Sequence, residues 1–346
     1  MIPSAEEQLQ FFHKIQLLLE EGSFSSTYKY ALLLAIADLS VEKGEELNSS
    51  LRLSVDSIAR KFIFYYWRQS IPYPSINEEG VLFQNNGKQA GVIKIITNYQ
   101  LENNRPLHQA IHDPVLINSV AKVVRTMPLW RLQKMPSGIV DFIYEQTTSG
   151  SEIVLREGVA YCFRVFHGHI QNMVQGAWLR WVRKLKHNHS LLGQLKDLNE
   201  FMFGSERANL GNYVPMLIEL QSNTCFYCDK SLKGNKSEVD HFLPWSRYPV
   251  DLGHNFVLAH SVCNRDKNDL LPAVTHLENW INRNDSNQSQ MDQYFCENNL
   301  LHDIDTSVSI TKWAYDKTEL LGGDVWLSKK NQTCKLDDSW RILFSK

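Results

Sequence analysis

The chain has 346 residues, of which 43% are hydrophobic and 21% charged, an ordinary globular composition that excludes global disorder. Its net charge of −2 argues against a protein that only coats nucleic acid. The longest apolar run, residues 31–37, is far shorter than the ~18 residues of a membrane span. The N-terminus lacks a signal-peptide pattern and six cysteines are too few for a disulfide scaffold, so we expect a cytoplasmic protein with no membrane partner.

Residues 1–204 predict a mainly helical N-terminal domain. Apolar spacing indicates helices at 4–21, 26–41 and 54–69. Ser4 suits the cap of the first helix. The second helix is apolar on most of its sides, so we expect it at the centre of a core.

The middle of the chain is basic. Residues 139–166 alternate between apolar and polar types, which predicts short strands, and a long helix is expected at about 169–186. The segment 121–196 holds eleven Lys and Arg residues against four Asp and Glu, a net charge of +7. A basic helix interleaved with tryptophan can follow a phosphate backbone, but solvated helix faces explain the same charges, and both interpretations stay open. The candidate nucleic-acid contacts here are Arg180, Arg183, Lys184 and Lys186.

Two pairs of soft metal ligands bracket one compact segment. Cys225 and Cys228 form a C-x2-C pair, and His260 and Cys263 form an H-x2-C pair that begins 32 residues after Cys228. Four nitrogen and sulfur ligands are the number that a tetrahedral structural zinc needs. The spacing therefore predicts a zinc site, and the alternative is a set of buried thiols with a strand-end histidine.

Asp240 and His241 lie between these two pairs. A carboxylate is a hard ligand that suits Mg²⁺, and an imidazole titrates near neutral pH, as a general base should. Neighbouring residues on a strand point to opposite faces, so the two side chains need a twist or a strand end to serve one site. Pro244, three residues on, fits such an end.

The segment 225–268 as a whole resembles the HNH endonuclease motif, the ββα-metal nuclease fold, in which zinc knuckles staple a β-hairpin and a helix. Asp240-His241 matches the pair that ends the first strand, Asn255 the residue that leads the second strand, and Asn264 the residue that opens the helix. The family's second knuckle is most often C-x2-C. Here a histidine replaces its first cysteine, a change that zinc tolerates.

The resemblance implies a role for each matching residue. Asp240 and Asn264 would hold one divalent cation, Mg²⁺ or Mn²⁺, at the scissile phosphate. His241 would take the proton from the attacking water, and Asn255 would tether the loop that presents His241. Nearby cations that could contact phosphates are Arg247, Arg265 and Lys267.

We therefore expect a mainly α (α+β) protein in three parts. They are the helical N-terminal domain (1–204), a zinc-stapled ββα-metal nuclease module (205–275) and a helical C-terminal extension (276–346). The N-terminal domain would bind nucleic acid or regulate the nuclease. The polar stretch 282–290 within the extension is expected to be a loop.

The expected function is hydrolysis of phosphodiester bonds in DNA, with RNA left open as a substrate. The segment FSSTYKYALLLAIADL is loosely similar to the leading part of bacterial HNH proteins of phage defence and restriction, which suggests a defence setting with a protein partner. Two alternatives stay open. One is a zinc-stapled nucleic-acid-binding module without catalysis, and the other is an effector nuclease that is active only within a larger assembly.

Overall fold

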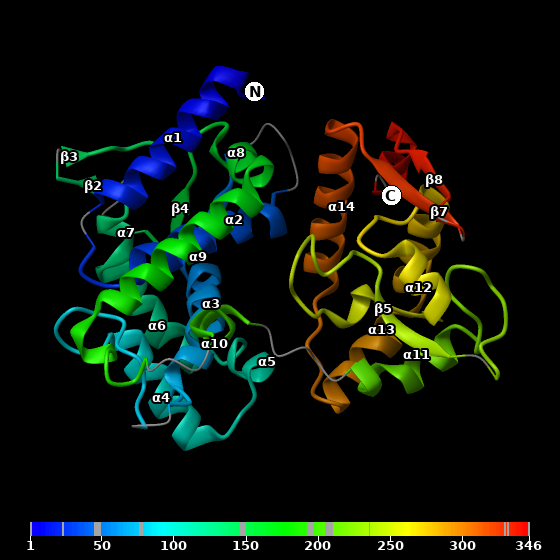
Figure 1. Cartoon of the computed structure of the whole chain (residues 1–346), viewed down its shortest axis with the longest axis horizontal. Coiled ribbons are helices and arrows are strands. Elements are labelled where there is room, and N and C mark those ends of the chain that lie inside the picture. Colours follow the sequence, from blue (N-terminus) through cyan, green and yellow to red (C-terminus); the bar gives the residue numbers. More distant parts are fainter. Residues whose placement is uncertain are drawn as a thin grey trace. The chain divides into compact units, whose positions relative to one another are not determined.

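The computed structural model describes residues 2–344 except 23, 45–49, 76–78, 137, 146–149, 193–196, 205–209, 235, 329 and 331. The chain forms two compact units, unit 1 (Met1–Gly204) and unit 2 (Ser205–Lys346), which are drawn in Figure 1. The predicted fold class, mainly α with small β elements, is confirmed. The predicted module start at residue 205 lies outside the described residues, and the separation of the nuclease module from a C-terminal extension stays a prediction.

Unit 1 is a helical assembly with two very short antiparallel sheets. Its elements are α1 (Ala5–Glu21), α2 (Tyr28–Glu42), β1 (Arg52–Ser54), α3 (Val55–Tyr66), α4 (Gly91–Asn103), α5 (Leu107–Ala110), α6 (Pro114–Thr126), α7 (Pro128–Arg131), β2 (Lys134–Met135), β3 (Gly138–Ile139), β4 (Glu152–Val154), α8 (Val159–Val165), α9 (His167–Lys184) and α10 (Leu198–Phe203). The sheets are β1 with β4 and β2 with β3. The helices therefore supply most of the core.

The apolar helix predicted at 26–41 is the centre of unit 1. It corresponds to α2, whose residues from Tyr28 to Val41 are all buried. α2 packs against α3, α8 and α9, so its apolar sides are covered by neighbouring helices. The predicted first helix is α1, which begins with a capping box in which Ser4 and Glu7 bond each other's backbone N–H groups.

The strands predicted at 139–166 are only partly correct. β4 exists and pairs with β1, but the following apolar run forms α8. Its buried residues Val159, Cys162 and Phe163 follow helical spacing, and this period prevails over the apparent alternation. Gly158 adopts a φ of 76° just before α8, a conformation that glycine reaches without strain.

The described part of unit 2 contains two antiparallel strand pairs, and one of them is followed directly by a helix. The elements of unit 2 are α11 (Val214–Leu220), β5 (Ser237–His241), β6 (Phe256–His260), α12 (Ser261–Lys267), α13 (Val274–Glu297), α14 (Ile304–Leu320), β7 (Asp324–Ser328) and β8 (Gln332–Lys335). β5 pairs with β6, and α12 follows β6 directly. This is the strand–strand–helix order that the resemblance implied.

The loop predicted at 282–290 is wrong, because these residues lie inside the long helix α13. Tertiary contacts outweigh their polar composition. Arg283 is buried and donates hydrogen bonds to the backbone oxygens of His254 and Phe256 at 2.7 and 2.6 Å, and Trp280 donates to the His254 oxygen at 3.0 Å. α13 therefore supports the start of β6.

No helix among the described residues combines the length and the apolar character needed to cross a membrane.

Candidate active site

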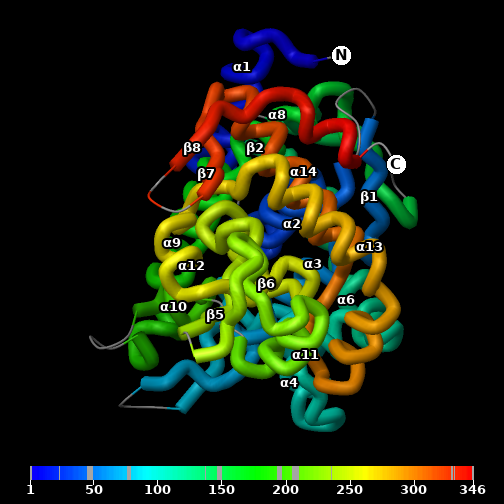
Figure 2. The backbone as a smooth tube through the Cα atoms, turned by 90° about the vertical axis from the view of Figure 1, so that its right-hand side faces the viewer, coloured from blue at the N-terminus to red at the C-terminus, as the bar shows by residue number. Residues whose placement is uncertain are grey.

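The β5–β6 hairpin sets the direction of each candidate side chain. Asp240 is paired with Val257 and His241 with Phe256, and Figure 2 shows the two strands side by side. Because side chains alternate along a strand, Asp240 and His241 leave β5 on opposite faces. The His241 ring accordingly packs edge-on against Phe256, with 4.8 Å between the ring centres.

His241 is held by a carboxylate that the sequence analysis missed. Its Nε2 lies 2.7 Å from Oδ1 of Asp251, and only 16% and 8% of the two side chains are exposed. A carboxylate accepts a hydrogen bond and so keeps the proton on Nε2, which leaves the lone pair of a neutral ring on Nδ1. The signal for it in the sequence is that Asp251 is the single acidic residue between His241 and Asn255.

Asn255 tethers the chain immediately after His241. Its side-chain oxygen accepts a hydrogen bond from the Leu243 N–H at 2.7 Å, and its amide donates to the Leu243 oxygen at 3.0 Å. The backbone oxygen of Asn255 also accepts from the Phe242 N–H at 2.8 Å. Only a carboxamide offers a donor and an acceptor that can bond both polar groups of one peptide residue in this way.

Asp240 lies on the α12 side of β5, in a buried polar cluster. Its Oδ2 accepts a hydrogen bond from the Tyr227 hydroxyl at 2.6 Å and lies 3.3 Å from the Lys267 ammonium. Burial raises the pKa of Asp240, and the positive charge of Lys267 opposes that rise. Lys267 also donates to the backbone oxygen of His241 at 3.1 Å, so its ammonium contacts both Asp240 and the residue that follows it.

Oxygen ligands gather on this same face. Glu238 lies two residues before Asp240 and shares its face, and the Asn264 amide donates to Glu238 Oε2 at 3.1 Å. The Asn264 oxygen and the two carboxylates are oxygen donors of the kind that Mg²⁺ or Mn²⁺ prefers, so the chemistry of these residues suits a divalent cation, which would have to share Asp240 with Tyr227 and Lys267. Asp240 and Asn264 therefore share one face of β5, whereas His241 leaves the other face, so the structure does not bring the imidazole together with the two oxygen ligands that the resemblance assigned to the same site.

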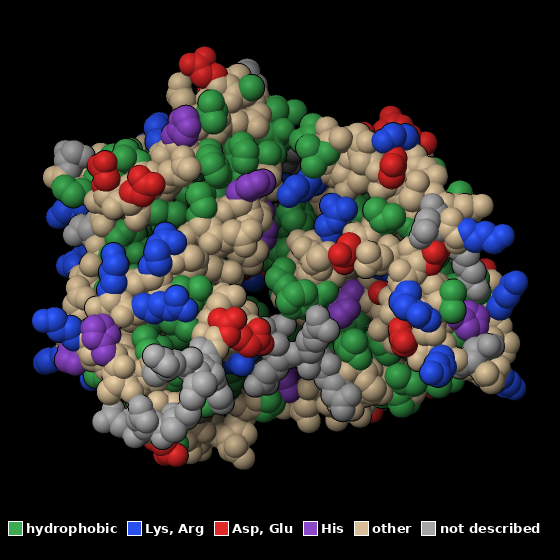
Figure 3. Space-filling model, viewed as in Figure 1, with side chains coloured by type: hydrophobic (Ala, Val, Ile, Leu, Met, Phe, Trp, Pro, Cys, Tyr) green, Lys and Arg blue, Asp and Glu red, His purple; other side chains and the backbone are tan. Residues whose placement is uncertain are grey.

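The predicted phosphate-binding cations have different surroundings. Lys267 is fully buried against Asp240, so its predicted contact with a phosphate is corrected to a charge-balancing role inside the protein. Arg247 is partly buried, which lowers its pKa, and Arg265 is exposed. The four predicted cations of unit 1, Arg180, Arg183, Lys184 and Lys186, are exposed, and Figure 3 shows Lys and Arg side chains gathered over α9.

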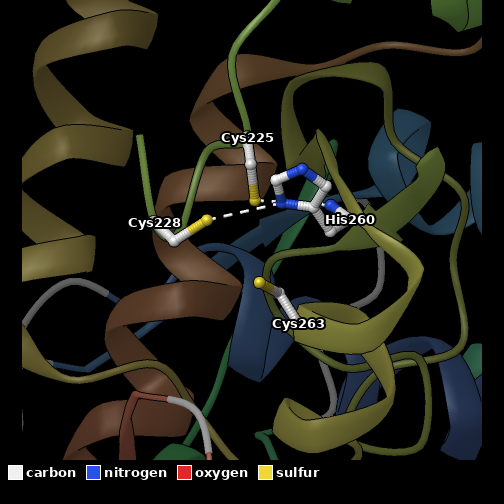
Figure 4. Close-up of side chains that lie close together, drawn as sticks. All are labelled: Cys225, Cys228, His260 and Cys263. Carbon is white, nitrogen blue, oxygen red and sulfur yellow. Dashed lines mark hydrogen bonds between the residues drawn. The ribbon is translucent and has the colours of Figure 1, made fainter. Parts of the chain in front are cut away.

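The four predicted soft ligands converge. Figure 4 shows Cys225, Cys228, His260 and Cys263 turned toward one another, and their ligand atoms lie within 4.8 Å of each other. Zinc holds sulfur at about 2.3 Å, which places two tetrahedral sulfur ligands about 3.8 Å apart. Small movements would therefore close the site around one ion.

The His260 ring is already oriented for this site. Its Nε2 lies 3.2 Å from the backbone oxygen of Ser231, and its Nδ1 lies 3.4 Å from the sulfur of Cys228. The carbonyl fixes the proton on Nε2 and turns Nδ1 toward the thiols. Burial and the neighbouring cysteines raise the pKa of Cys263 to about 12, and a cation among the thiols would counteract this rise.

Comparison with known proteins places the same segment in a family. Residues 225–273 match the family model described as HNH endonuclease. No curated protein and no solved structure matched the chain. The match begins at the first predicted zinc ligand and extends past α12, so it contains the site residues of unit 2 described above but not the four cations of unit 1.

Proposed function

Because residues 225–273 carry an HNH endonuclease domain, we propose that this protein is a metal-dependent endonuclease that hydrolyses phosphodiester bonds in DNA. The buried pair of Asp251 and His241 supports the proposal most. It presents an oriented imidazole of the kind that general-base catalysis needs. The presence of Asp240, His241 and Asn264 together in one segment speaks against a module that only binds nucleic acid, since binding alone needs none of them.

His241 is the general base of the proposed reaction. Its Nδ1 takes a proton from the attacking water, while Asp251 holds the ring orientation and stabilises the imidazolium that forms. Asn255 keeps the backbone after His241 in place. The imidazole therefore meets the water in one orientation, which lowers the entropic part of the barrier.

Asp240 and Asn264 are the residues that would hold Mg²⁺ or Mn²⁺. When bound, such an ion stabilises negative charge on the oxygens of the scissile phosphate. Zinc is the ion proposed for the four-ligand site, where it would staple the chain before β5 to the start of α12. The two sites differ in ligand chemistry, so one can be emptied by a zinc-selective chelator while the other is filled with Mg²⁺.

A plasmid-nicking assay with Mg²⁺ or Mn²⁺ tests the activity. Wild-type protein is expected to cleave, and His241→Ala is expected to lose about 10²–10⁴-fold in rate. His189→Ala removes an exposed histidine of unit 1 and should cleave as the wild type does. Equal rates for wild type and His241→Ala would contradict the proposal, and single-stranded DNA and RNA in parallel reactions identify the substrate.

The proposed setting is phage defence or restriction, supported by the loose similarity of residues 24–39 to such proteins. An effector that needs a partner would cleave only after that partner is added to the same assay. Purification from the native host with the partner bound, followed by nicking with and without it, separates this case from a nuclease that acts alone.

A further inference from the structure

A second candidate site lies in unit 1, outside the nuclease domain. A cavity of about 410 Å³ is lined by residues that include Ser25, Ser26, Lys29, Trp130, Arg131 and Lys134. It lies where α7 packs against α2, and residues 25 and 26, just before α2, add to its lining. Its volume lies in the range of small-molecule sites.

The cavity concentrates positive charge. Three of its described lining residues are cations and none of these described residues is acidic, and within the described part of the chain no carboxylate forms an ion pair with Lys29, Arg131 or Lys134. Lys29 is only 5% exposed. Bringing three like charges together around a buried ammonium is unfavourable, and a bound anion would offset this cost.

The surroundings of Lys29 disfavour its charged form. Its ammonium donates a hydrogen bond to the backbone oxygen of Lys134 at 2.9 Å, which leaves further N–H groups on the same nitrogen. Burial, together with the charges of Arg131 and Lys134, lowers the pKa of Lys29 to about 8. A negative group in the cavity would favour the charged form of Lys29 and gain three cationic partners at once.

The rest of the lining suits more than a bare anion. Trp130 is 37% exposed, and Tyr28 and Met127 add further apolar surface. Aromatic side chains beside cations are the combination on which bases stack while their phosphates are neutralised. The hydroxyls of Ser25 and Ser26 add hydrogen-bonding groups at the same cavity.

We propose that this cavity binds a phosphorylated nucleotide, with the phosphate among Lys29, Arg131 and Lys134 and the base against Trp130. Two sources share this chemistry: a free nucleotide, which would act as a regulatory ligand, and the 5′-phosphorylated end of a nucleic-acid strand, which would be anchored there. A cavity of this size encloses one nucleotide and not a duplex.

Binding measured without divalent cations tests the site independently of cleavage. The probes are AMP, ATP and inorganic phosphate by calorimetry, and a labelled ten-nucleotide single strand with a 5′-phosphate or a 5′-hydroxyl by fluorescence anisotropy. The double variant Arg131→Gln/Lys134→Gln removes two exposed charges and is expected to weaken binding by about 10-fold or more. The matched control, Lys88→Gln/Lys122→Gln, removes two exposed charges outside the cavity.

The outcomes separate the two sources and the failure of the inference. Binding of AMP or ATP supports a free nucleotide, whereas a preference for the 5′-phosphorylated strand with no binding of free nucleotides supports an anchored strand end. Equal binding by wild type and the cavity variant, no binding of any probe, or inorganic phosphate binding as tightly as AMP would each overturn the proposal. Circular dichroism of both variants confirms that they are folded.

Discussion

The contact between Asp251 and His241 carries the sharpest prediction for a single side chain. In Asp251→Asn the amide can donate a hydrogen bond to Nε2, which would move the imidazole proton to Nδ1 and block the proposed base. We expect kcat to fall by about 10²–10⁴-fold, with KM nearly unchanged because Asp251 is buried behind the ring. Initial nicking rates over a range of DNA concentrations measure both constants.

The control for this substitution is Asp285→Asn, which makes the same change at an exposed position of α13. It should leave both constants as in the wild type. A wild-type kcat for Asp251→Asn would show that the carboxylate does not orient the base, even if His241→Ala is inactive.

His241 is predictable from the sequence, whereas its partner Asp251 is not. His241, Asn255 and Asn264 belong to a motif with characteristic spacing, so their pattern is visible before folding. Asp251 lies in the loop between β5 and β6, where no periodicity fixes the direction of a side chain. The contact of Asp251 with His241 depends on the path of that loop, which the hydrogen bonds from Asn255 to Leu243 help to set.

Asp38 in α2 is a buried carboxylate that should make unit 1 sensitive to acid. Burial favours a higher pKa, but hydrogen bonds from His167 and Tyr65 and the charge of Lys61 together lower the pKa of Asp38. A lowered pKa means that the folded state favours the carboxylate. Its contribution to stability is therefore present above about pH 4 and is lost as the pH falls through the folded-state pKa.

Asp38→Asn tests this contribution. We expect the variant to be less stable than the wild type by about 3 kcal/mol at pH 7, and the difference to shrink toward pH 3. Urea unfolding of both proteins at several pH values measures it, with Asp56→Asn as a control at a half-exposed carboxylate. A difference that stays constant from pH 7 to pH 3 would contradict the assignment.

At the scale of elements, α9 is the candidate surface for the DNA backbone. Arg180, Arg183 and Lys184 are exposed and share one helix face through their i, i+3 and i+4 spacing. Replacing all three with Gln should lower DNA affinity for every sequence and reduce the slope of log K against log salt by up to about 0.9 per lost phosphate contact. Anisotropy titrations between 50 and 200 mM salt, about the range in which such slopes are resolved, measure both effects.

A matched triple variant separates a specific surface from overall charge. Lys88, Lys94 and Lys122 are exposed, and their replacement with Gln changes the net charge by the same amount. If this control lowers the salt slope as much as the α9 variant does, α9 is not a specific DNA-binding surface. Its cations are then solvated charges, as the alternative interpretation states.

The sequence predicts a helix or strand correctly where the spacing of its apolar residues matches the side of the element that is buried in the core. α1 and α2 have clear apolar patterns and were placed within a few residues. For α8 the sequence predicts a strand where the structure has a helix, because a short apolar run satisfies both periods. The polar part of α13 was misread as a loop because its helix depends on distant partners, chiefly the bonds from Arg283 to the start of β6, and no local pattern encodes them.

At the scale of the whole molecule, two units with separate cores predict two unfolding transitions. The main hydrophobic cluster runs from Phe11 to Met202 and lies wholly in unit 1, whereas the buried Phe256, Trp280 and Trp326 belong to unit 2. The Cys and His ligands lie in unit 2. A structural zinc contributes folding free energy directly, so a chelator should lower one transition temperature only.

Scanning calorimetry of the full chain tests this, and Asp38→Asn supplies the reciprocal perturbation. Chelation should shift the transition of unit 2, Asp38→Asn should shift that of unit 1, and the two shifts should add when combined because the perturbed sites lie in different cores. Cys334→Ser, at an exposed cysteine outside the ligand group, should leave the response to the chelator unchanged. A single transition that moves with both perturbations would mean that the units unfold as one cooperative body, and the independence inferred from their separate cores would be wrong.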